Sequence, residues 1–189
     1  MKKGLPVWAI VLGVIAIVGG FFLTTHNRLV KANEEVDNQW AQVESQYQRR
    51  FDLIPNLVES VKGAMAQEEE VFSKIAEART RYSSAQTSSE KAEAATEVEG
   101  ALARLLVVME NYPELKSLET VDTLMSQLEG TENRIAVERQ RYNDQVKEFN
   151  SDVKTIPTKW IASMFGFEEK AYFESVEGSE VAPKVDLTN

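Results

Sequence analysis

Few residues in this chain could do chemistry, and their spacing assembles no known catalytic arrangement. Ser151 and Lys154 form an S-x-x-K pair, the spacing of a serine nucleophile and a lysine base, but the S-D-N triplet expected beside it is missing. The chain has one histidine, His26, and no cysteine, which excludes an H-E-x-x-H zinc motif and a thiolate site. Glycine-rich phosphate loops are missing too. We therefore expect no cofactor, no metal and no catalytic residue.

Carboxylates are abundant, with 30 Asp and Glu against 21 Lys and Arg and a formal net charge of −9. The triplet Glu68 to Glu70 suits the positive end of a helix better than a metal site. Nucleic acid is not an expected partner, because such binding depends on clustered Lys and Arg that neutralise phosphates. One catalytic alternative stays open, a hydrolase-like enzyme whose carboxylates come together only at an oligomer interface.

An unbroken apolar run from Leu5 to Leu23 predicts that the chain is attached to a membrane. At about 1.5 Å per residue, a helix of this length crosses a hydrocarbon core of about 30 Å. We therefore expect residues 1–25 to form a membrane anchor. A cleavable signal peptide, cut after the small residues Gly19 and Gly20, is the alternative.

Basic residues flank the apolar run on both sides, with Lys2 and Lys3 before it and Arg28 and Lys31 after it. The positive-inside rule therefore favours neither orientation of the span clearly, because the basic residues on the two sides are nearly balanced. We expect the amino terminus inside the cell and the remaining chain on the extracytoplasmic side.

Apolar residues recur at helical spacing from residue 26 onward. A long first helix is interrupted at Pro55 by a kink or a fresh start, two shorter helices flank a Ser-rich loop, and a long fourth helix ends at Pro157. We expect an all-α fold, with an N-terminal transmembrane helix followed by an antiparallel up-and-down four-helix bundle whose first and fourth helices are long. The bundle would occupy residues 26–167, and residues 168–189 would form an acidic, largely disordered tail.

Three segments carry a resemblance to a known family: RRFDLIPNLVESVKGAM (49–65), LEGTENRIAVERQRYNDQVKEFN (128–150) and PTKWIASMFGF (157–167). With them the chain resembles the LemA family. The resemblance implies a bacterial inner-membrane protein with one amino-terminal span and a helical domain, and it implies no assigned activity. Some members are associated with membrane metallopeptidases or internal membrane compartments. The expected partners are therefore the lipid bilayer and a membrane-bound metallopeptidase or other membrane proteins.

Charged residues fall where apolar ones are expected if the fourth helix returns antiparallel to the first, with Ile156 beside Asn27. Arg50 then lies next to Glu132 in the seam between the two helices. We expect a partly buried polar cluster that fixes the helix register. Its members are Arg50, Glu132, Arg139, Glu44 and Asn133. A catalytic role is the alternative, although the cluster has no nucleophile.

The second and third helices are too short to cover the ends of the long helices near the membrane, so apolar side chains there would be exposed. An exposed apolar patch marks an interaction site, so we expect a homo-oligomer or a membrane-protein partner. The residues expected on this interaction surface are Val36, Trp40, Val43, Tyr142, Val146 and Phe149. The alternative is that longer second and third helices cover the patch.

The stretch from Pro157 to Phe167 contains Trp and Phe, residue types that favour the membrane–water boundary. The candidates for this role are Trp160, Ile161, Met164, Phe165 and Phe167. A lid packed across the end of the bundle is the alternative. Together these patterns predict a non-enzymatic, membrane-anchored helical scaffold or adaptor that self-associates or organises membrane-protein partners.

Overall fold

The computed structural model of the 189-residue chain describes residues 6–173, apart from the side chain of Lys116. All regular elements in this range are helices, and no strand occurs among the described residues. The all-helical prediction is therefore confirmed for this part of the chain.

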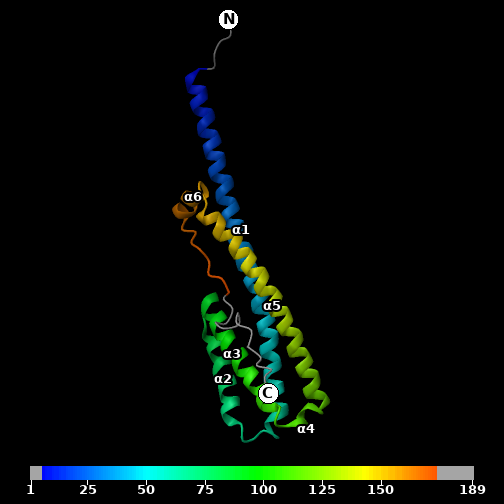
Figure 1. The fold of residues 1–189 in the computed structure, drawn as a ribbon. Coiled ribbons are helices and arrows are strands. Elements are labelled where there is room, and N and C mark those ends of the chain that lie inside the picture. The colour runs from blue at the N-terminus through cyan, green and yellow to red at the C-terminus, as the bar shows by residue number, and fades with distance from the viewer. Residues whose placement is uncertain (1–5, 174–189) are drawn as a thin grey trace, which may run out of the picture. The chain divides into compact units, whose positions relative to one another are not determined.

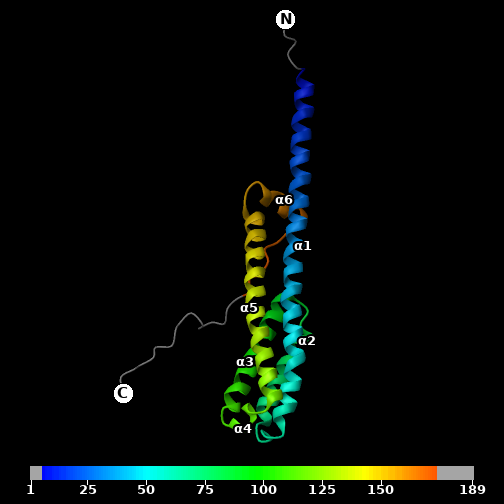
Figure 2. The same ribbon diagram turned by 90° about the vertical axis from the view of Figure 1, so that its right-hand side faces the viewer.

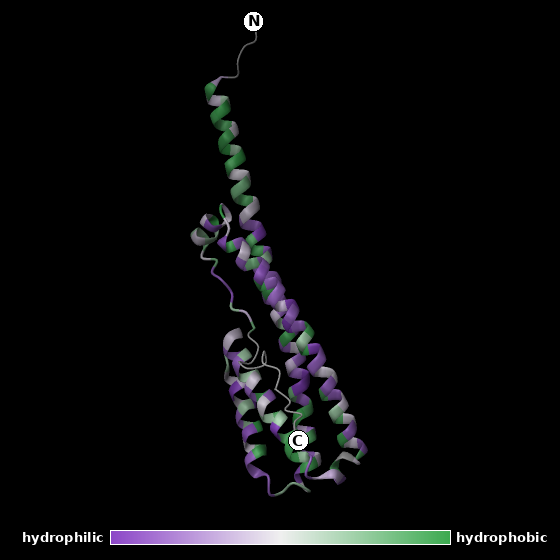
Figure 3. Ribbon diagram, in the orientation of Figure 1, coloured by the Kyte–Doolittle hydropathy of each residue, from purple (hydrophilic) through white to green (hydrophobic). Residues whose placement is uncertain are grey.

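The first element, α1, is one helix from Val7 to Lys62 (Figure 1). Its first part is apolar, as the green ribbon in Figure 3 shows, and it is long and apolar enough to cross a membrane. No other helix in the described range meets that criterion. The helix continues through Pro55, so a fresh start at this proline does not occur. Proline removes one backbone hydrogen bond of the helix, and the full burial of the neighbouring Ile54 and Leu57 offsets the free-energy cost of this loss.

Five further helices follow α1 in the described part of the chain. They are α2 (Glu69–Ser84), α3 (Ser88–Met109), α4 (Pro113–Lys116), α5 (Glu119–Lys154) and α6 (Thr158–Phe165). Residues 166–173 follow α6 without helical structure, and we call residues 166–171 the strap.

Local sequence explains where several helices begin and end. Thr87 caps α3, because its side chain accepts a hydrogen bond from the backbone N–H of Glu90 while the Glu90 carboxylate accepts one from the Thr87 N–H. Pro113 is the first residue of α4 rather than only a stop for α3, because the first helical turn needs no N–H there. Gly166 ends α6 in the left-handed region with φ of 74°.

The chain divides into two compact units. Unit 1 comprises Met1–Ala41 and Gln140–Ala171, and unit 2 comprises Gln42–Arg139 and Tyr172–Asn189. Both α1 and α5 therefore contribute one segment to each unit.

Unit 2 contains segments of α1 and α5 together with α2, α3 and α4. The helices α2 and α3 pack along each other (Figure 1). The unit has a continuous apolar core in which many side chains are fully shielded from solvent. The largest of these are Tyr47, Ile54, Leu57, Met65, Leu102, Leu105 and Ile135.

Unit 1 pairs the first part of α1 with the last part of α5, which run side by side in Figures 1 and 2. Arg28 forms an ion pair with Asp152 at 3.1 Å, and the Trp40 ring contacts that of Tyr142 at 5.4 Å between centroids. These two pairs show that the segments are antiparallel, in a register within one helical turn of the predicted one. Helix α6 packs against this pair, with Ile161 and Ala162 buried on Leu29.

Candidate functional site

The most polar part of the unit 2 interior is a network that joins α1, α3 and α5. The Arg139 Nε donates a hydrogen bond to the Tyr47 hydroxyl at 2.8 Å, and that hydroxyl lies 3.2 Å from a Glu99 carboxylate oxygen, to which it donates. Arg139 also forms an ion pair with Glu99, which closes the triangle. Each polar group of this network thus has a partner of matching chemistry.

Two further ion pairs lie near this network. Arg50 on α1 pairs with Glu132 on α5, and Lys91 on α3 pairs with Glu44 on α1. Arg50 is 7% exposed, whereas the side chain of Glu132 is 47% exposed, so the first pair joins a buried cation to a half-exposed anion. Such a pair is weak evidence for stability, because the cost of removing the charges from water offsets their attraction.

Burial shifts the pKa of two groups in this part of unit 2, Tyr47 and Arg50. It raises the pKa of Tyr47 above the ordinary range for tyrosine, with the Glu99 carboxylate adding to the effect. Burial likewise lowers the pKa of the Arg50 guanidinium. A phenol with a raised pKa stays protonated at neutral pH, so Tyr47 acts here as a hydrogen-bonding group and is unsuited to be a base or nucleophile.

The structure brings together only part of the predicted polar cluster. Arg50 and Glu132 meet, whereas Arg139 and Glu44 pair with Glu99 and Lys91 on α3. Asn133 is exposed. Sequence reasoning missed Tyr47, Glu99 and Lys91 as members of the network. The helical spacing places Tyr47 at an apolar position, which is typical of a core residue rather than of a polar network. Nothing in the sequence indicates how α3 is aligned with the long helices.

Nothing in the described part of unit 2 resembles a metal centre, since no group of three or more His, Asp or Glu residues there could hold an ion. A surface hollow of this unit is lined by Lys62, Ala66, Glu69, Phe72 and Ser73. No member of the polar network lines that hollow.

The surface predicted to be exposed near the membrane is buried, which is a correction to the sequence analysis. Five of its six residues are at most 5% exposed, and Trp40 is partly covered. The five are Val36, Val43, Tyr142, Val146 and Phe149. The reason in unit 1 is the strap, since the Phe167 ring packs against Phe149 and the Tyr142 hydroxyl donates to the Ala171 carbonyl at 3.1 Å.

The strap is held by specific polar contacts of unit 1. The Asn150 side chain donates to the Lys170 carbonyl at 2.9 Å and accepts from the Lys170 N–H at 2.8 Å. The Lys170 ammonium also pairs with Asp37 at 2.9 Å, and Lys154 pairs with Glu169 at 2.7 Å. The first residues of the segment predicted to be a largely disordered tail thus make specific contacts, and residues 174–189 lie outside the described residues.

Helix α6 has two different faces. Its inner face is buried in unit 1 through Thr158, Ile161 and Ala162. Its outer face is exposed although it carries large apolar side chains, with Trp160 at 66% and Met164 at 69%. Of the candidates for the membrane boundary, Ile161 and the partly buried Phe167 face the protein, and Trp160, Met164 and Phe165 are exposed.

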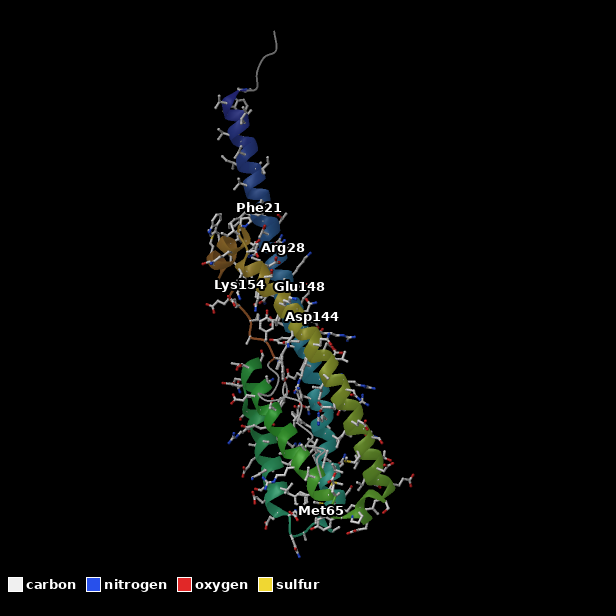
Figure 4. All side chains as sticks on the ribbon, viewed as in Figure 1. Phe21, Arg28, Met65, Asp144, Glu148 and Lys154 are labelled. Carbon is white, nitrogen blue, oxygen red and sulfur yellow. The ribbon has the colours of Figure 1, made fainter. Side chains whose placement is uncertain are left out.

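The aromatic rings of α6 and the strap lie against α1 near the end of its apolar part. Phe165 is 5.6 Å from Phe22 and 4.3 Å from His26, measured between ring centroids. Figure 4 labels Phe21, Arg28 and Lys154 at this end of unit 1. An exposed apolar helix face thus lies directly beside the segment that is able to span a membrane.

Comparison with known proteins finds a matching family model and several relatives of this chain. The family model described as the LemA family matches residues 39–187. The chain is 26% identical to magnetosome protein MamQ 2 of Paramagnetospirillum magneticum, over 87% of this chain and 70% of the relative. It is 24% identical to magnetosome protein MamQ of Magnetospirillum gryphiswaldense, over 92% and 74%. It is 23% identical to protein LemA of Metamycoplasma hominis, over 94% and 84%.

Proposed function

Because the chain belongs to the LemA family, we propose that it is a non-enzymatic, membrane-anchored helical scaffold or adaptor that self-associates or organises membrane-protein partners. The observation that carries this proposal is the continuity of α1 from Val7 to Lys62. The apolar segment and the core helix of unit 2 are one element with no linker between them. In this proposal an up-and-down four-helix bundle provides the surface on which partners assemble.

The polar chemistry of unit 2 supports a structural role over a catalytic one. The carboxylates of Glu44, Glu99 and Glu132 are each neutralised by a basic partner, and the Tyr47 phenol is held in its protonated form. A hydrolase needs a nucleophile beside a base, and this network has neither in a free state. Neither the family description nor the names of the relatives state an enzymatic activity.

We place the protein in the bacterial inner membrane with a single span and with its helical domain on the extracytoplasmic side. The proposed partners are a second copy of the chain and other membrane proteins, among them a membrane-bound metallopeptidase. The exposed apolar face of α6 supports a role at the membrane, because it adds apolar surface beside the proposed span.

Crosslinking in native membranes tests this function. Two full-length copies with different tags are co-expressed, crosslinked with a lysine-reactive reagent and analysed by mass spectrometry. We expect crosslinks between the two tags and to integral membrane proteins, and light scattering in mild detergent should report more than one copy. A control replaces residues 5–23 with an unrelated apolar helix, which separates association through the domain from association through the span. A protein that is monomeric in detergent, and whose crosslinks all lie within one copy of the chain, would overturn the proposal.

A further inference from the structure

The outer face of α6 has a composition that does not suit contact with water. Trp160 and Met164 are one helical turn apart and more than half exposed, and Ile156, just before the helix, is 63% exposed. The inner face of the same helix packs on Leu29 through Ile161 and Ala162. The outer apolar side chains take no part in this buried cluster, so their presence requires another explanation.

The contact between Phe165 and Phe22 fixes where α6 lies along the axis of the proposed span. Phe22 belongs to the apolar run that ends at Leu23. The span cannot move toward the amino terminus, because that would bring the charged Lys2 and Lys3 into the hydrocarbon core. A span needs about 20 residues, so it uses the run up to this end. Phe165, 5.6 Å from Phe22 and 4.3 Å from His26, therefore lies just beyond the end of the apolar run, at the boundary of the hydrocarbon core.

The other end of α6 contacts α1 at a residue beyond the apolar run. Arg28 donates a hydrogen bond to the Thr158 hydroxyl at 3.3 Å. Arg28 is six residues beyond Phe22, a rise of about 9 Å along the helix. The headgroup region on each side of a bilayer is about 5 to 8 Å thick. Both ends of α6 therefore contact α1 at or near the headgroup layer beyond the apolar run.

We propose that the outer face of α6 inserts into the boundary between headgroups and acyl chains of the bilayer that α1 crosses. The occupant of this face is lipid, because the face continues the exposed apolar surface of the span and carries the tryptophan that such boundaries favour. Lys159 beside it is exposed and long enough to reach the headgroups. The inference rests on the proposed membrane anchoring and adds a second membrane contact to it.

Single-tryptophan variants of the full chain test the proposal, since the protein has three tryptophans. Replacement of Trp8 and Trp40 by Phe leaves Trp160 as the reporter. The variant is reconstituted into vesicles whose lipids carry bromine at a shallow or a deep acyl position. We expect blue-shifted Trp160 emission, with shallow bromine quenching it at least twofold more than deep bromine.

Two matched variants serve as controls. A chain that keeps only Trp8, in the apolar part of α1, should be quenched by brominated lipid. A chain that keeps only Trp40, which packs on Tyr142 in unit 1, should not be quenched. Circular dichroism of each variant verifies that it has folded.

Each remaining outcome overturns the proposal in a distinct way. If Trp160 emits as in water and acrylamide quenches it freely, the outer face of α6 is solvated. If Trp160 is shielded from both acrylamide and bromine, a protein covers the face, which would itself favour the scaffold function. Should Trp8 also escape bromine, α1 does not span the bilayer, and the membrane anchoring has failed rather than α6 alone.

Discussion

The guanidinium of Arg139 lies over the ring of Phe173, with its carbon 4.3 Å from the ring centroid. The same ring stacks on Tyr47 at 6.4 Å between centroids. Phe173 is 7% exposed although it belongs to no helix. The partly buried network of unit 2 is thus covered on one side by an aromatic side chain from the segment that follows α6.

Replacement of Phe173 by Ala should destabilise unit 2. The change exposes the network to water and removes the contact with Arg139, so we expect a loss of about 2 to 4 kcal/mol in the free energy of unfolding. Denaturant unfolding of the intact protein in mild detergent, followed by circular dichroism, measures the loss. The neighbouring Tyr172, which is 47% exposed, is the control, and its replacement by Ala should cost less than about 1 kcal/mol. Equal losses would show that Phe173 is not a specific cover.

Replacement of Asn150 by Ala should release the strap. Two backbone groups of Lys170 lose their partners, and we expect a cost of about 1 to 3 kcal/mol. Hydrogen exchange at the Lys170 amide, monitored by mass spectrometry, should become faster. The control is Lys170→Ala, which removes the ion pair with Asp37 but keeps both backbone bonds and should cost at most about 1 kcal/mol. Unchanged exchange in the Asn150 variant would refute this role.

Replacement of Glu132 by Gln should leave the buried Arg50 without its counter-ion. Because Glu132 itself is half exposed, we expect a loss of about 1 to 3 kcal/mol rather than the full cost of breaking a buried pair. Glu129→Gln is the control, since Glu129 lies on the same helix and is exposed. Denaturation midpoints compare the two variants. If both unfold with the parent, the Arg50 pair does not hold the register.

The protein should lose stability at alkaline pH. Burial raises the pKa of Tyr47, so between about pH 10 and the higher pKa of the folded state the unfolded chain binds fewer protons than the folded one. The stabilising effect of Tyr47 is therefore complete below about pH 10 and is lost progressively above it.

The midpoint of denaturation, measured from pH 8 to pH 11, checks whether stability falls as the pH rises. Tyr47→Phe should flatten the alkaline fall, although Tyr82, whose pKa burial also raises, keeps part of it. The exposed Tyr172, replaced by Phe, should leave the fall as it is in the parent. An alkaline profile that Tyr47→Phe does not alter would contradict the prediction.

Heptad spacing was sufficient to identify the inward face of α1, although not how fully Val36 and Val43, expected on an exposed surface, are covered. Leu29, Val36, Val43 and Leu57 recur every seven residues and are at most 1% exposed. Arg50 falls in the same seam and is buried too, which is why its pairing with Glu132 could be anticipated. A repeat of this kind identifies the inward face because the helix turns through nearly two full turns every seven residues.

The strap and the contacts of α3 could not be predicted in the same way. Residues 166–171 have no periodicity, and their main attachment is to backbone atoms, which every sequence possesses. Glu99 lies on a helix rich in Glu and Ala, so several of its carboxylates were equal candidates for Arg139. The choice depends on how α3 is rotated and shifted against α1, and local spacing contains no information about that shift.

The pairing of Asn150 with the main chain of Lys170 has a consequence for how this segment can diverge. The two bonds use an amide hydrogen and a carbonyl oxygen that nineteen of the twenty amino acids supply equally, proline alone lacking the hydrogen. Position 170 is therefore free to accept almost any substitution, while position 150 is restricted to a side chain that both donates and accepts. Homologous chains should preserve the amide at 150 and drift at 170.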